Sequence, residues 1–354
     1  MTRKKVLICP LNWGLGHATR DVPIIRLLLK HNFNIIIAAS GDSLAYLKKE
    51  FPELEFINFE SYKVQYSRFE SQVFKMLMLI PSILFWTIKE HLLLKEIIKN
   101  NKIGIVISDP RFGLWNKKTH NVFITHQLRI KFPGLLKIFE PVYHKISNKL
   151  IRNYEECWIP DFEGQNNLSG ELSHVKDTLK NTFFIGPLSR FEYIAKENTD
   201  SKIDVLFILS GPEPQRSVFE KIICDQTKNS VLKYEIVRGT SSQSEHPFDF
   251  PVNNILNAED LFTLIKKSEI VVCRSGYSSI MDLFQLKKKA ILVPTPGQTE
   301  QEYLAGYLKQ KGFFYSVSQK NFNLQKDIKQ VPEFPEIKMT ESLNLEERVL
   351  GLLQ

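Results

Sequence analysis

The chain has 354 residues, which is long enough for two domains that each bury a core of their own. Hydrophobic residues make up 43% and charged residues 24%, which excludes a disordered protein. The formal net charge of +8 suits an anionic partner such as a nucleotide diphosphate or a lipid headgroup. The basic residues are dispersed and form no recognised nucleic-acid motif, which argues against a nucleic-acid partner.

Four cysteines are spread along the chain and form no CxxC pair: Cys9, Cys157, Cys224 and Cys273. This spacing predicts neither a zinc site nor a disulfide framework, and it favours a reducing compartment. The longest apolar run covers residues 76–86, is interrupted by Pro81, and is shorter than the roughly 20 residues of a membrane-spanning helix. We therefore expect a cytoplasmic protein, with the inner face of the membrane as the one alternative location.

Strand and helix signals alternate from the start of the chain, a pattern that predicts a parallel sheet covered on both faces. In the first half, strands are expected at residues 5–10, 34–39, 54–59, 103–108, 121–125, 157–160 and 182–186. Helices are expected at 18–30 and 43–50. Pro23 is tolerable in the first of these only if it lies within the first turn.

A polar, charged segment at residues 191–202 is interpreted as an interdomain linker. Beyond it, strands are expected at 204–209, 234–238, 269–273 and 290–294, and helices at 215–228, 259–267, 278–286, 299–311 and 344–353. The predicted class is α/β, with two Rossmann-like, doubly wound parallel-sheet domains facing a central cleft. The predicted boundaries are an N-terminal acceptor-side domain at 1–190, a donor domain at 203–340, and a C-terminal helix at 341–354 that could pack back on the N-terminal domain.

The segment from Arg274 to Ser279 leaves an apolar strand and immediately opens a helix. At such a junction, free backbone N–H groups and the positive end of the helix dipole point at whatever lies above, which suits a phosphate. An ordinary serine N-cap is the structural alternative. Asp282 follows one turn later, where a carboxylate can accept hydrogen bonds from ribose hydroxyls, or can simply be a solvated helix residue.

Polar residues follow the next strand, in the run from Pro294 to Glu302. Gln301 and Glu302 could bind sugar hydroxyls there, and an exposed helix start is the alternative interpretation. Together with the stretch from Val271 to Gly276 and with Asp282, these residues resemble the donor-binding half of GT-B glycosyltransferases. The likeness is closest to family 28, which includes the N-acetylglucosaminyltransferase of peptidoglycan lipid-intermediate synthesis, and it is good over residues 255–315.

The resemblance implies roles for individual residues of this half. The helix start from Gly276 to Ser279 would hold the diphosphate, Asp282 the ribose of a uridine nucleotide, and Gln301 with Glu302 the donor sugar. Family members usually carry glutamate at the position of Asp282 and glutamine at that of Glu302, which leaves the exact donor open. The sequence does not distinguish uridine from thymidine, because base contacts in such sites are often made by backbone.

Further donor-side candidates come from two turns that follow strands. One turn contains Gly14 and Gly16, and the other contains Ser210 and Gly211. Ser210 and Gly211 could contact the diphosphate, with Arg216 nearby to offset its charge. The full set of donor-binding candidates is Gly14, Gly16, Ser210, Gly211, Arg216, Arg274, Ser275, Gly276, Ser278, Ser279, Asp282, Gln301 and Glu302.

The turn Gly14-Leu15-Gly16-His17 follows the first strand and lacks the third glycine of a dinucleotide fingerprint. His17 could take a proton from an acceptor hydroxyl near neutral pH, or could merely cap the helix. Glycine-rich turns ending in histidine occupy this place in similar enzymes, which favours catalysis. Asp109, at the end of a buried strand, could orient His17 or cap the turn with Pro110.

Two residues after the strand at 121–125, His126 and Gln127, are candidates for the acceptor side. The stretches 73–99 and 130–152 combine apolar residues with lysines. An amphipathic helix of this kind can lie on an anionic membrane surface, and the alternative is a core helix with a solvated lysine face. A lipid-linked acceptor, as in the resembling family, would favour the membrane interpretation.

The sequence predicts a glycosyltransferase that moves a sugar such as N-acetylglucosamine from a UDP-sugar to an acceptor hydroxyl, with inversion. No Asp-x-Asp pair is present to hold a metal, so neither metal nor cofactor is expected, and the UDP-sugar is a co-substrate. The acceptor, the stereochemistry and the oligomeric state stay open. The alternatives are a UDP-sugar 2-epimerase on the same scaffold and a non-catalytic, membrane-associated protein that binds nucleotide sugars.

Overall fold

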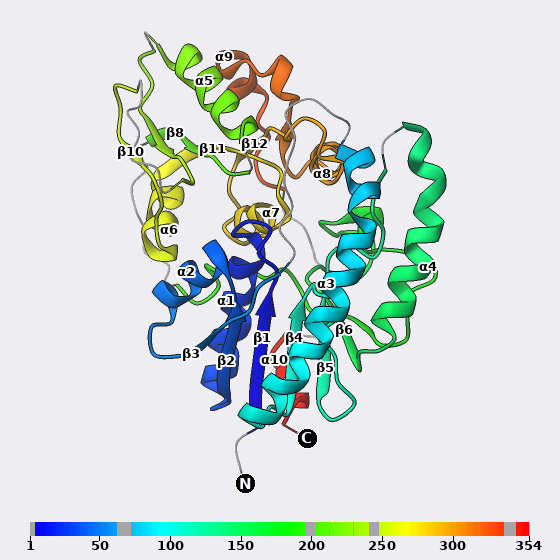
Figure 1. Cartoon of the computed structure of the whole chain (residues 1–354). Helices are drawn as coiled ribbons and strands as arrows, with labels where there is room; N and C mark the ends of the chain where they lie inside the picture. Colours follow the sequence, from blue (N-terminus) through cyan, green and yellow to red (C-terminus); the bar gives the residue numbers. More distant parts are fainter. Residues whose placement is uncertain are drawn as a thin grey trace. The chain divides into compact units, whose positions relative to one another are not determined.

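The computed structural model describes residues 4–61, 72–132, 134–194, 203–211, 213–228, 230–240, 248–335 and 345–353, with the backbone alone for 72–81, 83 and 135. The chain divides into two compact units. The first contains the described residues up to Arg190 together with the last helix, and the second extends from Phe191 to Ile337. Figure 1 shows the helices and strands of both units.

The first unit is built on a seven-stranded parallel sheet with the order β3-β2-β1-β4-β5-β6-β7. Its strands are β1 (Lys5–Pro10), β2 (Asn34–Ala39), β3 (Glu55–Asn58), β4 (Ile105–Asp109), β5 (His120–Ile124), β6 (Glu156–Ile159) and β7 (Thr182–Phe184). Its helices are α1 (Gly16–Lys30), α2 (Gly41–Glu50), α3 (Gln72–Asn101), α4 (Glu140–Ile151) and α10 (Leu345–Gly351), with 3-10 turns η1 (Gly134–Phe139) and η2 (Gly170–Leu172). The predicted strands of this half are all present, with ends that shift by one or two residues.

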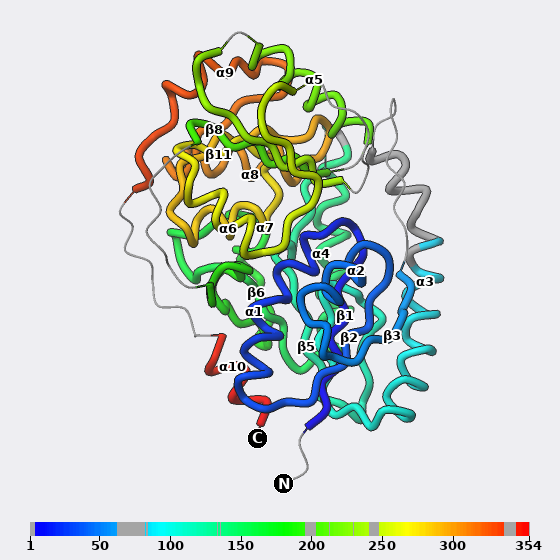
Figure 2. Tube along the Cα trace, turned by 90° about the vertical axis from the view of Figure 1, so that its left-hand side faces the viewer, coloured from blue at the N-terminus to red at the C-terminus, as the bar shows by residue number. Residues whose placement is uncertain are grey.

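Both faces of this sheet are covered by helices. Alternate residues of β1, Leu7 and Cys9, belong to a buried cluster with Leu94 and Ile98 of α3. In Figure 2, α1 and α10 lie on one side of the strands and α3 on the other. The near-continuous apolar strands are explained by this double coverage, because a central parallel strand has no solvent-facing side.

Pro23 lies in the interior of α1, beyond its first turn. The prediction that the helix tolerates Pro23 only in the first turn is therefore wrong. Val22, Pro23, Ile24 and Ile25 are all buried, so the ring lies on the packed side of the helix. Burial of this apolar segment offsets the one helical hydrogen bond that a proline nitrogen cannot donate.

The second unit holds a six-stranded parallel sheet with the order β10-β9-β8-β11-β12-β13. Its strands are β8 (Ile203–Ile208), β9 (Tyr234–Val237), β10 (Val252–Asn253), β11 (Ser268–Cys273), β12 (Ala290–Leu292) and β13 (Tyr315–Ser316). Its helices are α5 (Gln215–Thr227), α6 (Ala258–Lys267), α7 (Tyr277–Gln285), α8 (Thr299–Gln310) and α9 (Leu324–Asp327), with 3-10 turns η3 (Gln319–Asn321) and η4 (Ile328–Gln330). Two doubly wound parallel sheets confirm the predicted α/β class.

The boundary between the units falls at the start of the predicted linker. Phe191 is buried and its ring centroid lies 5.8 Å from that of Phe262 in α6, so it packs as a core residue of the second unit. Residues 195–202 of the predicted linker lie outside the described residues.

Helix α10 packs against the first unit, far from its neighbours in sequence. Glu346 accepts hydrogen bonds from Lys30 Nζ at 2.7 Å and His31 Nε2 at 3.1 Å. Arg348 pairs with Glu156 at 3.1 Å, and Val349 is fully buried. These contacts fix α10 beside α1 and β6.

Two further findings concern composition. All four cysteines are buried, free thiols. Within the part of the chain that the structure describes, no helix combines the length and apolarity needed to cross a bilayer.

Candidate active site

The order of each sheet reverses at one pair of strands, and ligands of doubly wound folds bind beyond the carboxyl ends at that point. In the first unit the reversal lies between β1 and β4, which pair from Val6–Ile105 to Pro10–Asp109. In the second unit it lies between β8 and β11. The segments that follow these four strands include most of the residues that the sequence marked as candidates.

The turn between β1 and α1 requires glycine at one position. Gly14 has φ +98°, a backbone conformation that would be strained in a residue with a side chain. Leu15, the N-cap of α1, makes no side-chain cap hydrogen bond, and the first turn carries no acidic residue. The helix therefore begins with its backbone N–H groups directed beyond the strand ends, one residue before His17.

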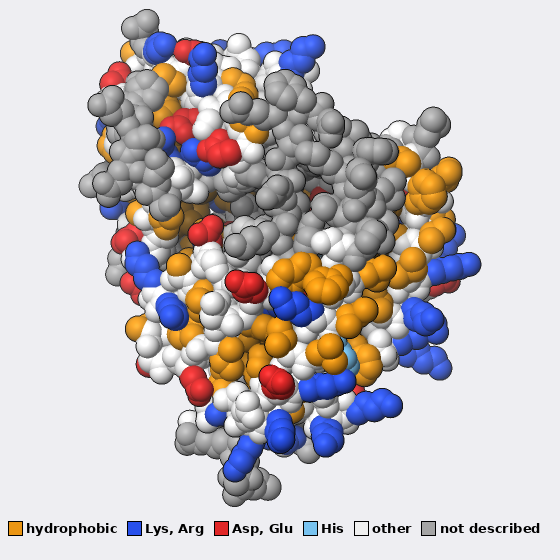
Figure 3. Space-filling view, viewed as in Figure 1, with side chains coloured by type: hydrophobic (Ala, Val, Ile, Leu, Met, Phe, Trp, Pro, Cys, Tyr) orange, Lys and Arg blue, Asp and Glu red, His pale blue; other side chains and the backbone are white. Residues whose placement is uncertain are grey.

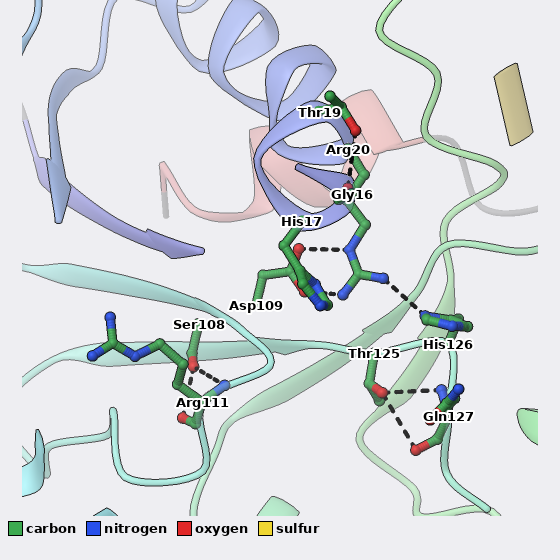
Figure 4. Close-up of polar contacts among 10 residues, drawn as sticks. All are labelled: Gly16, His17, Thr19, Arg20, Ser108, Asp109, Arg111, Thr125, His126 and Gln127. Atoms are coloured by element: carbon green, nitrogen blue, oxygen red, sulfur yellow. Dashed lines mark hydrogen bonds and ion pairs between the residues drawn. The ribbon is translucent and has the colours of Figure 1, made fainter. Parts of the chain in front are cut away.

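His17 and Asp109 meet, which is one of the two arrangements that the sequence left open for Asp109. Nδ1 of His17 lies 3.2 Å from Oδ1 of Asp109, which is the last residue of β4 and is fully buried (Figure 4). The side chain of His17 keeps 18% of its surface exposed, so a substrate can reach it. Burial, followed by the charge of Arg20 and the proximity of His126, lowers the pKa of His17 well below its ordinary value. The imidazole is therefore neutral at physiological pH and can accept a proton.

Arg20, one helical turn beyond His17, completes this cluster. Its Nε donates to Asp109 Oδ2 at 2.5 Å, its Nη2 donates to Oδ1 of the same carboxylate, and its Nη1 lies 2.8 Å from His126 Nδ1. Arg20, Asp109 and His126 are all buried. Figure 4 shows the guanidinium between the carboxylate and the second histidine. We refer to His17, Arg20, Asp109 and His126 as the histidine cluster.

Gln127 is held by its own backbone near this cluster. Its N–H donates to Thr125 Oγ1 at 3.0 Å, which fixes the turn after β5 that also places His126. Gln127 is half-buried, and none of its contacts in Figure 4 reaches the histidine cluster.

A second buried arginine holds the loop after β4. Arg111 pairs with Glu90 of α3 at 2.9 Å, and its guanidinium lies 4.3 Å from the ring centroid of Phe59. Its backbone N–H donates to Ser108 Oγ at 3.0 Å, and its carbonyl accepts from Tyr154 Oη at 2.8 Å. These contacts hold the loop on both sides and so keep Asp109 in place.

In the second unit, the loop after β11 exposes a helix start. Gly276 is the N-cap of α7, and a Cβ added there would meet nothing within 4 Å. The first turn of α7 contains no acidic residue, and Ser278 and Ser279 are half-buried there. Gly211, after β8, has φ +94° and is exposed. These features match the needs of a phosphate site.

Several side chains around this helix start already form hydrogen bonds with backbone groups of the protein, which the sequence did not indicate. Ser275 Oγ donates to the carbonyl of Gln301 at 2.8 Å. Gln301 Oε1 accepts from the N–H of Thr295 at 2.8 Å, and Glu302 Oε1 from that of Gly297 at 3.0 Å. The side chains of Gln301 and Glu302 therefore hold the loop after β12 in its conformation. Asp282 lies in α7 and is 4% exposed.

Both candidate arginines of the second unit already have protein partners. Arg274 is buried and donates to the carbonyls of Val293 at 3.1 Å and Gln215 at 2.8 Å. Arg216 donates to Glu220 at 2.8 Å and also pairs with Glu213. The two guanidiniums shape the loops around the helix start in this structure.

The comparisons with known proteins agree with this geometry. Residues 205–349 match the glycosyltransferase family 28 C-terminal domain. The chain is also similar, at 13% identity and a TM-score of 0.67, to the crystal structure of the glycotransferase of kitacinnamycin, over 99% of this chain and 94% of that one. Residues 205–349 therefore form a glycosyltransferase family 28 C-terminal domain, and the chain has the GT-B fold.

Two curated relatives resemble the glycosyltransferase along its sequence. An uncharacterized glycosyltransferase of Methanosarcina acetivorans is 22% identical over 87% of this chain and 84% of its own length. The UDP-N-acetylglucosamine–N-acetylmuramyl-(pentapeptide) pyrophosphoryl-undecaprenol N-acetylglucosamine transferase of Elusimicrobium minutum is 23% identical over 39% of this chain and 43% of its own length.

Sequence reasoning missed Arg20 of the glycosyltransferase. The signal was available, because residues three apart on a helix share a face and Arg20 stands three residues after His17. Nothing in the sequence showed that this shared face points to Asp109.

Proposed function

We propose that this glycosyltransferase transfers a sugar, with N-acetylglucosamine the first to test, from a UDP-sugar to an acceptor hydroxyl with inversion. The observation that carries the proposal is the contact of His17 with Asp109 at the reversal point of the first sheet. A neutral histidine oriented by a buried carboxylate is the arrangement of a general base.

In the proposed reaction, Nε2 of His17 takes the proton of the acceptor hydroxyl while Asp109 orients the ring and stabilises the imidazolium. The acceptor oxygen forms a bond to the anomeric carbon from the face opposite the nucleotide. The bond between that carbon and the β-phosphate oxygen breaks, and UDP leaves with the electron pair.

Backbone N–H groups at the start of α7 would stabilise the charge that develops on the diphosphate. The open N-cap at Gly276 supports this role, and Gly211 offers a second backbone contact. Asp282 would hold the ribose, and Gln301 with Glu302 would shape the loop that contacts the sugar. Arg216 and Arg274 would act by ordering these loops, since both guanidiniums are bound to protein groups.

We further propose that the acceptor is lipid-linked and that the first unit binds an anionic membrane surface from the cytoplasm. The supporting observation is a set of exposed apolar side chains on α3 and around the start of α4. They are Leu84, Phe85, Ile88, Leu92, Ile138, Phe139, Val142 and Ile146. Figure 3 shows apolar side chains gathered over α3 with basic ones beside them.

Calorimetry tests the donor site first. Titration of the protein with UDP, TDP, GDP and ADP should show preferential binding of UDP, and Asp282→Ala should weaken it. Absence of binding for all four nucleotides would remove the basis of the donor assignment.

His17→Gln separates binding from chemistry in the same preparation. It should retain UDP affinity and lower donor turnover by roughly 10²- to 10⁴-fold, which is the usual contribution of a general base. His120 is the first residue of β5, at the opposite end of the strand from His126. His120→Gln is therefore the matched control and should keep turnover. Conversion of the UDP-sugar to its 2-epimer without acceptor would instead establish the epimerase alternative.

A further inference from the structure

The guanidinium of Arg20 contacts two residues of the histidine cluster, Asp109 and His126, and the chemistry of these contacts fixes where protons lie. A guanidinium has only donors and stays charged at all relevant pH values. Nδ1 of His126, 2.8 Å from Arg20 Nη1, must therefore accept the hydrogen bond. A neutral His126 then carries its proton on Nε2.

The same reasoning gives the opposite result for His17. Arg20 contacts both oxygens of Asp109, which favours the ionised carboxylate, and an ionised carboxylate only accepts hydrogen bonds. Nδ1 of His17, 3.2 Å from Asp109 Oδ1, must therefore carry the proton. Nε2 of His17 is left with a lone pair.

We infer that Arg20 is a positioning residue that holds His17 and His126 as opposite neutral tautomers, one a proton acceptor at Nε2 and the other a hydrogen-bond donor at Nε2. The tautomers follow from the contacts alone. Their use in catalysis rests on the proposed function, in which His17 is the base.

Arg20 also sets the charge of the cluster. Within the described first unit, the titratable and charged groups around His17 are Arg20 on the same helix, Asp109 from β4 and His126 from the turn after β5. A second proton on His126 would lie on Nδ1, facing the Arg20 guanidinium. Both burial and the Arg20 charge lower the pKa of His17, so the base remains neutral as pH falls.

The arrangement has a consequence for the substrate. Because His126 can donate but not accept at Nε2, any group that contacts this atom, from the protein or from an acceptor molecule, must offer a lone pair. His17, by contrast, requires a hydroxyl that can give up its proton. The two rings would thus discriminate between oxygen atoms of the acceptor.

The test is long-range ¹H–¹⁵N NMR of the full-length protein labelled at histidine nitrogens, which distinguishes the two neutral tautomers without any substrate. His17→Gln and His126→Gln assign the signals. We expect Nδ1–H for His17 and Nε2–H for His126 in the neutral rings. The same tautomer at both rings would overturn the inference.

Arg20→Met should release His126 into a tautomer mixture, while the Asp109 carboxylate keeps the proton of His17 on Nδ1. It should also shift the acid limb of the kcat/KM profile to higher pH, because the Asp109 charge would then act on His17 alone. Arg20→Lys keeps the charge but loses the planar fork, and should shift the limb less. Arg26→Met removes an arginine–carboxylate pair, to Glu50, from the same helix and should change neither readout.

The wild-type spectrum keeps the test decisive if Arg20→Met does not fold. The two proposals also fail separately. The expected tautomers in a protein whose His17→Gln variant turns over normally would sustain the inference about Arg20 and reject His17 as the base. An unchanged His126 tautomer and an unchanged acid limb in a folded Arg20→Met would reject the role of Arg20.

Discussion

Asp21 follows Arg20 directly in the sequence. Whereas the Arg20 guanidinium has hydrogen-bond partners, the Asp21 carboxyl group is buried without one among the described residues. Its side chain is fully buried, and neither carboxylate oxygen has a hydrogen-bond partner among the described residues. Burial raises the pKa of Asp21 to about 7, although the nearby charge of Arg20 opposes this shift. At acidic pH the carboxyl is neutral in the folded protein, and as the pH rises an uncompensated charge builds up in the core.

The sign of the pH dependence follows from this shift. The pKa of Asp21 is higher in the folded than in the unfolded state, so its contribution to stability is complete below the unfolded value and declines as pH rises toward about 7. Asp21→Asn should remove this decline and raise the free energy of unfolding at alkaline pH, relative to wild type, by up to about 4 kcal/mol at roughly 1.4 kcal/mol per pKa unit.

Urea unfolding at a series of pH values measures this difference. Asp177→Asn changes the same charge at an exposed position and serves as the control, with an expected effect within about 0.5 kcal/mol. A difference between wild type and Asp21→Asn that stays constant with pH would show that Asp21 keeps an ordinary pKa.

The residues of the candidate site were predictable to different degrees. His17 follows β1 and Asp109 ends β4 at the reversal of the sheet, and the strand pattern was enough to offer their pairing as one of two alternatives. Arg20 could not be found this way, because its role depends on the direction of a side chain rather than on the position of its element. The direction of the Arg274 side chain could not be predicted either. Its position beside a candidate phosphate-binding turn gave no sign that its guanidinium points into the interior.

Helix α3 combines two kinds of surface. Leu94 and Ile98 are buried against β1, whereas Phe85 and Ile88, nearer its amino end, are 64% and 62% exposed. Lys89 lies on this exposed part with its Nζ 4.3 Å from the ring centroid of Trp86. The sequence left a core helix and a membrane-surface helix as alternatives, and the structure shows that one helix buries only part of its apolar surface.

This exposed part predicts binding to anionic vesicles. Phe85→Ser with Ile88→Ser should weaken association at least tenfold, since inserting one large apolar side chain contributes roughly 1.5–3 kcal/mol. Flotation with vesicles of phosphatidylcholine, with and without phosphatidylglycerol, measures it. Wild type should prefer the anionic vesicles, because each nearby lysine adds about 1 kcal/mol.

Val231→Ser is the matched control for this experiment. Val231 is 97% exposed but lies in the second unit, so its loss should leave vesicle binding unchanged. Equal binding of wild type and the double variant, or equal binding to both kinds of vesicle, would rule out the proposed surface.

Elements with a strong period were predicted well, and those that depend on tertiary contacts were not. Strands β1 and β2 match their predicted bounds because buried apolar runs define them. Strands β10 and β13 contain two residues each and exist only through their neighbours in the sheet, so no local signal marks them. The interior position of Pro23 likewise depends on packing.

At the scale of the whole molecule, each unit has its own buried core. One core of the first unit includes Leu7 and Val106, and that of the second includes Phe207 and Val272. Because the cores are separate, we expect calorimetric unfolding in two steps rather than one. A nucleotide bound by the second unit should then stabilise only the step that belongs to that unit.

Scanning calorimetry with and without UDP tests this expectation. UDP at 100 times its Kd should stabilise the second unit by about 2.7 kcal/mol and leave the other transition in place. Asp282→Ala should reduce the shift, while His17→Gln should preserve it. If UDP stabilised only the unfolding transition of the first unit, the nucleotide would be bound by that unit, and the donor assignment to the second unit would be wrong.

The return of α10 to the first unit affects how the chain folds as it leaves the ribosome. Domains usually fold in the order in which they are synthesised, yet this first unit lacks one of its helices until residues 345–351 have emerged. The second unit, already complete by then, can fold before the first has closed. A nascent chain that stalls before residue 345 would expose the apolar site of Val349 beside α1, a surface that chaperones recognise.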